Sequence, residues 1–451
     1  MAFQALRGTT DLLPEEVARW SAVEHAARRL ARVYGYREVR TPVIEEAGLF
    51  LRSVGETTDI VQKEMFRFKD RGEHDIVLRP EGTAAVVRAY LEHHLHKTEG
   101  FAKLFYLGPM FRAERPQAGR FRQFHQYGVE AIGSASPWVD VEAITLCVHI
   151  LRECGVKEAV VWLSSMGCRN DQENTAADLR GRLTPHKSKL CQECQDRFEK
   201  NVFRVLDCKN PTCHELAWEK SYTQEERGNV SWPFLLCDEC VRHDQEVQRA
   251  LRQLDIPFER SKPFTRGLDY YTRTIFEVRA AGLGAQDAVA AGGRYDHLVE
   301  EFGGPSMGAF GFAAGIERVL MAVAHGKSGE APAARRGLYL AAAQPTLVGE
   351  TFRLIQRLRE RGVMTLMDYD GKSLKAQLRE ADQAGCQAVA ILGERELKDR
   401  TISVRELGPR SCSQTLGKSE RTVPLDVFVE EIAQSSGIRH HCGEKSAQGG
   451  I

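Results

Sequence analysis

Residues 111–133 read FRAERPQAGRFRQFHQYGVEAIG, and this stretch decides the fold of the chain. A Pro-Gln-Ala-Gly turn separates two strand-like segments, which predicts a β-hairpin. The hairpin carries four arginines within eleven positions: Arg112, Arg115, Arg120 and Arg122. Guanidinium groups match phosphate oxygens two at a time, so a hairpin of this kind can hold a polyphosphate. The alternative is a solvated, charged hairpin.

The segments around this hairpin extend the strand pattern. DIVLRP, LFYLGPMFR and QFHQYGVEAIG are short apolar strands between turn signals, and they predict an antiparallel sheet with added helices. Helical spacing of apolar residues predicts helices at 15–34, 83–94 and 138–153, and AVVWLSS predicts a further strand. Gln126 and Glu130 are an even number of residues apart, so they share one face of their strand.

The rest of the chain changes character twice. Residues 168–258 are polar and rich in cysteine, as expected of an inserted module. After a Gly/Ala/Pro/Ser-rich linker, the pattern alternates strand and helix, which predicts a small α/β domain. The predicted organisation is a catalytic domain in two parts, 1–167 and 259–325, with the module at 168–258, a linker at 326–336, a C-terminal domain at 337–434 and a disordered tail at 435–451.

Composition excludes several classes of protein. The 451 residues hold 62 Lys+Arg and 62 Asp+Glu, so the net charge is zero, which argues against a broadly basic nucleic-acid binder. No segment reaches the roughly 18 apolar residues of a membrane helix, and the N-terminus lacks the apolar core of a signal peptide. We therefore expect a cytoplasmic protein with no membrane contact. Positive charge is instead concentrated locally. The segment Arg112–Arg122 contains four arginines and a single acidic residue, Glu114.

Six of the 12 cysteines fall within the module: Cys191, Cys194, Cys208, Cys213, Cys237 and Cys240. Two of their spacings are Cys-x-x-Cys, which is typical of a four-thiolate zinc site. We therefore predict one structural Zn²⁺ on Cys191, Cys194, Cys237 and Cys240, with Cys208 and Cys213 in reserve. A disulfide pair or an iron–sulfur cluster is the alternative. The other six cysteines, Cys168 among them, are scattered without paired spacing.

The hairpin block resembles motif 2 of class II aminoacyl-tRNA synthetases. Tyr36–Glu45 resembles motif 1, and GFAAGIERVL with Arg318 resembles motif 3. LRPEGT (78–83), RGLDYYTRTIFEV (266–278) and AGGRYDHLVEEFGG (291–304) are similar to segments of bacterial histidyl-tRNA synthetases. The resemblance runs from Arg7 to about Ala433. It implies a class II α+β catalytic fold, a C-terminal α/β anticodon-binding domain and a homodimer built through motif 1.

The resemblance also implies roles for individual residues. Histidine is activated when its carboxylate attacks the α-phosphate of ATP, so positioning and charge neutralisation are the protein's task. Arg112 and Arg266 would contact the α-phosphate from opposite sides as the catalytic residues. The remaining ATP contacts would come from Arg120 and Arg318 on the outer phosphates, Phe124 on the adenine, and Mg²⁺ between phosphates.

The same comparison implies the sites for histidine and tRNA. The α-ammonium group of L-histidine would be held by the segment Glu81, Gly82 and Thr83 together with Gln126. Glu130 and Tyr271 would bracket the imidazole nitrogens, with Tyr270 adjacent. Arg115 and Gln117 would meet the acceptor end of tRNA(His), although a mobile surface loop is an equal alternative.

One position departs from the family pattern, and one alternative function stays open. His297 stands where the pattern has glycine, and we expect it to narrow or reshape the edge of the substrate pocket without abolishing activity. A non-catalytic, regulatory paralogue of the synthetases is the alternative to an ATP-dependent histidine–tRNA ligase. A zinc-dependent nucleic-acid module would explain the cysteines alone.

Overall fold

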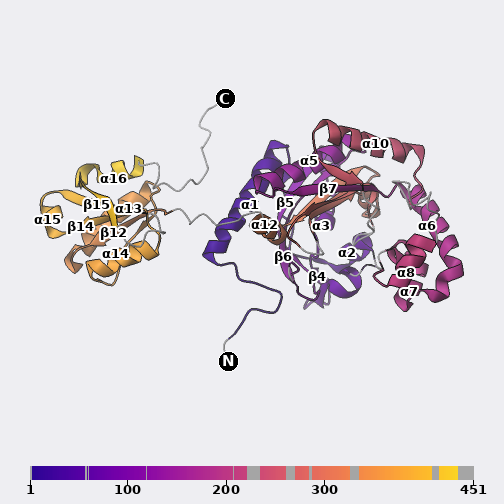
Figure 1. The fold of residues 1–451 in the computed structure, drawn as a ribbon, viewed down its shortest axis with the longest axis horizontal. Helices are drawn as coiled ribbons and strands as arrows, with labels where there is room; N and C mark the ends of the chain where they lie inside the picture. Colours follow the sequence, from indigo (N-terminus) through magenta and orange to yellow (C-terminus); the bar gives the residue numbers. More distant parts are fainter. Residues whose placement is uncertain are drawn as a thin grey trace. The chain divides into compact units, whose positions relative to one another are not determined.

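The computed structural model describes residues 3–55, 58, 60–117, 119–206, 208–220, 234–260, 270–283, 287–325, 335–408 and 416–434. The chain forms two compact units, Met1–Ser328 and Gly329–Ile451 (Figure 1). Each unit has its own hydrophobic core. The predicted linker falls mostly on 326–334, and the tail on 435–451, both outside the described residues.

The first unit is built on an eight-stranded sheet with the strand order β1-β5-β6-β11-β10-β9-β7-β8. The pairings from β5 to β7 are antiparallel, while the short edge strands β1 and β8 pair in parallel. The strands of this sheet are β1 Arg37–Glu38, β5 Ala102–Phe111, β6 Gln123–Ile132, β7 Ala159–Ser165, β8 Phe258–Arg260, β9 Thr272–Ala280, β10 Ala288–Arg294 and β11 Ala309–Gly315. The predicted hairpin is confirmed as β5 and β6.

Helices cover the sheet because their apolar faces match its buried side chains. The largest core joins the sheet to four helices: α1 Pro14–Val33, α5 Pro137–Glu153, α10 Asp238–Gln253 and α12 Ile316–His325. A second core packs α3 Thr83–Glu92 against β5 and against the tyrosines directly before β9. A small sheet completes this part, with β2 Ile44–Glu46, β3 Phe66–Lys69 and β4 Asp75–Leu78. Short helices lie between these elements: α2 Ala47–Val54, α4 Leu95–Thr98 and α11 Leu298–Glu301.

The cysteine-rich module is helical and has a core of its own. Its helices are α6 Arg169–Leu183, α7 Gln192–Lys200 and α8 Pro211–His214. Leu179, Phe198 and Trp218 are buried in this core together with Cys194 and Cys213.

The module ends before the predicted boundary at 258. Helix α10 places Val247, Ala250 and Leu251 in the main core, and β8 pairs with β7 at the sheet edge. The polar composition of α10 reflects its exposed face, so composition alone placed this helix in the module.

The second unit contains a five-stranded mixed sheet, ordered β13-β12-β14-β15-β16. The strands β12 Leu338–Ala342, β13 Thr365–Leu366 and β14 Ala388–Leu392 are parallel, as the strand–helix rhythm predicts. Two antiparallel strands, β15 Thr401–Leu407 and β16 Leu416–Pro424, extend this sheet beyond the prediction. The helices are α13 Val348–Glu360, α14 Leu374–Gln383, α15 Glu394–Lys398 and α16 Leu425–Gln434. Among the described residues, no helix is long and apolar enough to cross a membrane.

Candidate active site

Two buried carboxylates lie together where α3 begins beside strand β6. The oxygens of Glu81 accept backbone hydrogen bonds from Thr83 at 2.6 Å and Ala84 at 2.9 Å, so this carboxylate caps α3. Glu130 is fully buried, and its Oε1 accepts a 2.7 Å bond from the Thr83 hydroxyl. The Tyr295 hydroxyl donates to Oε2 of Glu130. The predicted residues Glu81, Thr83 and Glu130 are therefore brought together, and Tyr295 joins them.

Burial raises the pKa of both acids. It raises the pKa of Glu130 to about 8, because the ionised form loses its hydration, while the bonds from Tyr295 and Thr83 offset only part of this effect. Burial also raises the pKa of Glu81, and the N–H groups at the start of α3 counter it. An ammonium group would stabilise the ionised form of either acid, and an imidazole can form a hydrogen bond with either the ionised or the protonated form.

Tyrosine rings surround these acids. The Tyr270 ring is 4.9 Å from that of Tyr271 and 5.7 Å from that of Tyr295, measured between centroids. The Tyr106 ring fills space that two glycines leave open, since a Cβ would come within 2.4 Å of it at Gly82 and within 2.5 Å at Gly128. Gly82 is thus required for packing as well as lying in the predicted binding segment.

Gln126 and His297 are the other two residues that were predicted to lie at or near the histidine-binding site. The amide oxygen of Gln126 is buried and has no hydrogen-bond partner within the described part of the chain, so it is available to accept a bond from an ammonium group. His297 directly precedes α11 with φ −107°, a conformation open to any residue. Histidine at this position therefore causes no backbone strain.

The predicted ATP residues lie on the hairpin and on the start of α12. The Nε of Arg112 donates to the carbonyl of Pro80 at 3.0 Å, and its guanidinium lies 5.2 Å from the Phe124 ring centroid. Burial lowers the pKa of Arg318, and the positive charge of Arg120 lowers it further. Arg120 itself forms a 2.9 Å ion pair with Glu114. A phosphate placed beside Arg318 would stabilise its charged form.

Three predicted site residues remain: Arg115, Gln117 and Arg266. Arg115 and Gln117 are exposed at the tip of the hairpin, where Gln117 and Arg120 form a β-bridge. These residues line a hollow that also includes Lys63 and Glu64. Arg266 lies outside the described residues, so its predicted contact with the α-phosphate stays a prediction.

Tyr295 and Tyr106 were not predicted as site residues, although both contact the predicted site. Tyr295 lies directly after the Gly-Gly-Arg segment, where glycines allow strands to approach closely. That local glycine density was the available signal. Tyr106 carried none, because an apolar strand such as β5 is expected to bury aromatic side chains in any case.

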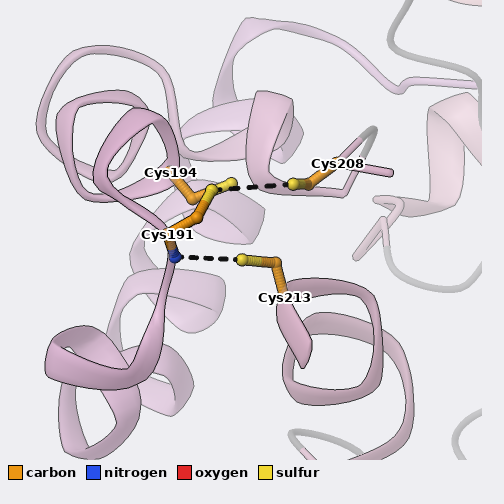
Figure 2. Close-up of side chains that lie close together, drawn as sticks. All are labelled: Cys191, Cys194, Cys208 and Cys213. Carbon is orange, nitrogen blue, oxygen red and sulfur yellow. Dashed lines mark hydrogen bonds between the residues drawn. The ribbon is translucent and has the colours of Figure 1, made fainter. Parts of the chain in front are cut away.

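Four cysteines of the module form a compact cluster. The Sγ atoms of Cys191, Cys194, Cys208 and Cys213 all lie within 4.8 Å of one another (Figure 2). The Cys191–Cys208 distance is 3.9 Å, close to the edge of about 3.8 Å that a tetrahedron with Zn–S bonds of 2.3 Å requires. The Cys191 N–H donates to Cys213 Sγ at 3.2 Å. These four residues therefore fit a zinc ion.

The predicted ligand set is wrong in its pairing. Cys237 and Cys240 do not join Cys191 and Cys194, but lie with Cys168 and Asp171 in a separate cluster. Cys208 and Cys213 are full members of the first cluster. The cause is the chain path, because α10 leaves the module and packs on the sheet. Two Cys-x-x-Cys pairs in a sequence do not by themselves show that the two pairs bind the same metal ion.

Comparison with known proteins decides the family. The sequence profile described as "Histidyl-tRNA synthetase" matches residues 8–171 and 237–319, and the profile described as "Anticodon binding domain" matches residues 338–435. The chain belongs to the histidyl-tRNA synthetase family. Both the predicted family and the predicted class II fold with its C-terminal anticodon-binding domain are confirmed. The enzyme class is that of the aminoacyl-tRNA synthetases, which are ligases.

Full-length relatives agree with this assignment. The histidine–tRNA ligase of Desulfitobacterium hafniense (strain DCB-2) is 46% identical over 432 residues, covering 96% of this chain and 98% of the relative. That of Natranaerobius thermophilus is 40% identical and covers 97% of this chain and all of the relative. The apo histidyl-tRNA synthetase of S. aureus superposes with a TM-score of 0.77 at 31% identity, covering 96% of this chain and 100% of the other. These relatives do not support the alternative that the chain is a non-catalytic, regulatory paralogue.

Proposed function

We propose that the chain is a histidine–tRNA ligase that works in two steps. The carboxylate of L-histidine attacks the α-phosphate of ATP, which forms histidyl-adenylate and releases diphosphate. The terminal ribose hydroxyl of tRNA(His) then attacks the histidyl carbonyl, and AMP leaves. The observation that carries the proposal is the buried Glu81–Thr83–Glu130 cluster, whose two acids need a cationic ligand.

Histidine supplies a cation at one end, its α-ammonium group, and a hydrogen-bonding imidazole at the other. Its α-ammonium group donates to Glu81 and to the buried amide oxygen of Gln126. Its imidazole contacts Glu130 on one side and Tyr271 on the other. An apolar isostere would make no hydrogen bond to Glu130 or Tyr271, and this loss provides discrimination of the kind seen when buried polar groups read a substrate.

ATP binds along the arginine-bearing hairpin. Arg112 contacts the α-phosphate, Phe124 stacks on the adenine, and Arg120 with Arg318 holds the outer phosphates. The cation–π contact between Arg112 and Phe124 shows that these two side chains share one small space. Mg²⁺, when bound with ATP, would neutralise phosphate charge.

The tRNA contacts both units. The exposed Arg115 and Gln117 at the hairpin tip meet the acceptor end, because their side chains are free of the core and can each make two parallel hydrogen bonds. The anticodon-binding domain of the second unit binds the other end of tRNA.

The test is histidine-dependent exchange of labelled diphosphate into ATP. Purified protein with Mg²⁺ should exchange diphosphate with histidine and not with other amino acids. Absence of exchange above background would refute the proposed activity. The variant Arg266→His should lower the exchange rate far more than histidine affinity, whereas equal losses would mean that Arg266 only shapes the binding site.

The first cysteine cluster holds a structural zinc ion under this proposal. Cys194, Cys208 and Cys213 are buried within the module's core, so thiolates without a metal would be poorly solvated there. Cys194→Ser should lower the zinc content and the melting temperature of the module. A full zinc content in this variant would refute the assignment.

The protein acts as a cytoplasmic homodimer under this proposal. Near motif 1 two apolar side chains are exposed, Val33 at 69% and Ile44 at 50%, and a second copy that packs on this part of the chain would cover them. Sedimentation equilibrium should give twice the mass of one chain at micromolar concentration. A monomer at that concentration would argue against the dimer.

A further inference from the structure

The second cysteine cluster has the donor set of a metal site. Its members are Cys168, Asp171, Cys237 and Cys240, whose ligand atoms all lie within 4.8 Å of one another. Cys168 and Cys237 directly precede helices α6 and α10, while Asp171 and Cys240 lie three residues further, in the first turn of the same helices. Two helix starts therefore face each other, and each contributes a cap residue and a first-turn residue.

Hydrogen bonds hold this arrangement before any metal binds. The Oδ1 of Asp171 accepts a 3.0 Å bond from the Cys237 N–H, and Oδ2 accepts a 3.2 Å bond from the Cys168 N–H. Asp171 is 2% exposed and Cys240 is 1% exposed. Each carboxylate oxygen keeps a second lone pair, and such outer hydrogen bonds orient a metal ligand. Gly167 permits the approach, since a Cβ there would come within 2.5 Å of the Asp171 side chain.

We propose that a second zinc ion is bound by Cys168, Asp171, Cys237 and Cys240. This ion joins the start of α6, in the module, to the start of α10, which packs on the catalytic sheet. Three thiolates and one carboxylate are ligands that Zn²⁺ accepts in tetrahedral geometry. A disulfide would use only two of the three thiols and would leave the Asp171 carboxylate with no part in the chemistry. The site is distinct from the four-cysteine cluster, so the chain carries two zinc ions rather than one.

The second zinc site lies beside the start of strand β9. The Arg273 N–H donates to the carbonyl of Gly167 at 2.7 Å, and the Met166 N–H donates to the carbonyl of Arg273 at 2.8 Å. The Gln172 side chain donates to the carbonyl of Tyr271 at 2.9 Å. Helix α6 therefore holds the backbone of a residue that we place against the imidazole. The ligands act as positioning residues for Tyr271, and this functional consequence rests on the proposed histidine–tRNA ligase activity.

Zinc stoichiometry tests the site without using activity. Protein purified from zinc-supplemented medium without chelators should contain two zinc ions per chain by plasma mass spectrometry. Cys240→Ser and Cys194→Ser should each contain one, and the double variant none. Wild-type zinc content in Cys240→Ser, or a single zinc ion in the wild type that Cys194→Ser removes, would overturn the proposal.

Protection of a thiol from chemical modification tests the site in the wild-type protein, so this test applies even if a variant fails to fold. In the wild-type protein, iodoacetamide should modify Cys237 slowly before zinc removal and rapidly after it, although Cys237 is exposed. Equal rates before and after removal, or a reductant-sensitive disulfide between two of these cysteines, would overturn the proposal. Neither result bears on diphosphate exchange, so failure of the metal site and failure of the ligase activity remain distinguishable.

The positioning role has a matched control. Cys240→Ser should raise the KM for histidine in diphosphate exchange several-fold while the KM for ATP changes little. Gln172→Ala removes the bond to Tyr271 and should raise the same KM with two zinc ions still bound. An unchanged histidine KM in Cys240→Ser with one zinc ion would overturn the positioning role and leave a purely structural metal.

Discussion

The hydroxyl of Thr83 donates a 2.7 Å hydrogen bond to Oε1 of Glu130, and so joins the start of helix α3 to strand β6. Glu81 caps the same helix, which places two buried acids on either side of Thr83. The hydrogen bonds at the start of α3 therefore also form the polar cluster that we assign to histidine binding. The protonation of Glu130 becomes the property of this cluster that is easiest to measure.

Histidine affinity should depend on pH through Glu130. Burial raises the pKa of Glu130 to about 8, whereas the free imidazole has a pKa of about 6.5. Between these values a neutral imidazole meets a protonated Glu130, so binding needs no net proton exchange. Below this range binding releases a proton, and above it binding takes one up, so affinity falls on both sides. Titration calorimetry in two buffers of different ionisation enthalpy measures the proton count directly.

Glu130→Gln provides the control for this profile. The variant should bind histidine roughly ten- to a hundredfold more weakly, since hydrogen bonds to charged groups contribute about 1.5–3 kcal/mol. It should also lose the part of the alkaline decline that Glu130 causes, while any decline due to the α-amino group remains. Identical alkaline limbs in the wild type and the variant would contradict the raised pKa.

Arg112 and Arg115 should separate adenylate formation from tRNA charging. Arg112→Ala should slow diphosphate exchange by about 10²–10³-fold, because a fixed donor to the developing charge is lost. Histidine affinity, measured by calorimetry, should change little. Arg115→Ala should leave exchange intact and slow aminoacylation, since this side chain is exposed at the hairpin tip. A loss of exchange in Arg115→Ala equal to that in Arg112→Ala would contradict the two assigned roles.

Strong local patterns made most of the fold predictable. Helix α5 and strands β6 and β7 have clear periodicity, and their predicted bounds agree with the structure to within a few residues. Strand β15 was missed although it shows the same kind of signal, with Ile402 and Val404 buried at alternate positions. Its antiparallel pairing breaks the βαβ rhythm that the prediction extended along the chain.

Site residues that are close together in the sequence could be predicted. Site residues that long-range packing brings together could not. LRPEGT contains both the carboxylate of Glu81 and the helix start that it caps, so one segment carries the whole signal. The pairing of Cys237 with Cys168 depends on two helix starts meeting from positions about 70 residues apart in sequence. Asp171 at the third position of a helix is an ordinary capping residue by sequence, and only its neighbours suggest a ligand.

Asp140→Asn should strongly destabilise the first unit. Asp140 on α5 is fully buried, paired with Arg294 on β10 and bonded at 2.7 Å to Nε2 of His243 on α10. Removing its charge leaves the buried Arg294 with Asp296 as its remaining counter-charge. Breaking a buried ion pair of this kind costs about 3–5 kcal/mol of unfolding free energy. Urea denaturation followed by tryptophan fluorescence measures this cost.

Glu153→Gln on the same helix is the matched control. Its pair with Arg29 is nearly half exposed on both sides, so the loss should stay below about 1 kcal/mol. Burial alone would raise the pKa of Asp140, but Arg294 and His243 hold it below the usual range. Its contribution is therefore present at neutral pH and lost as the pH falls below about 4 through the folded-state pKa. Equal costs for the two variants at pH 7 would mean that the buried pair is not stabilising.

Gly311→Ala should disturb both the histidine site and the local backbone, because a Cβ there would also come within 2.6 Å of the Val129 carbonyl oxygen. Gly311 lies opposite Glu130 in the pairing of β11 with β6, and a Cβ there would come within 1.9 Å of Oε2 of Glu130. The carboxylate must move, which breaks its bond to Tyr295, so the KM for histidine should rise at least about tenfold, or 1.4 kcal/mol. The KM for ATP should change much less, because the arginines that we assign to ATP lie elsewhere on the hairpin. Gly48→Ala on α2 has nothing within 4 Å of the new methyl group and should keep both KM values. A histidine KM in Gly311→Ala that matches that of Gly48→Ala, in protein with a native circular dichroism spectrum, would remove Glu130 from the histidine site.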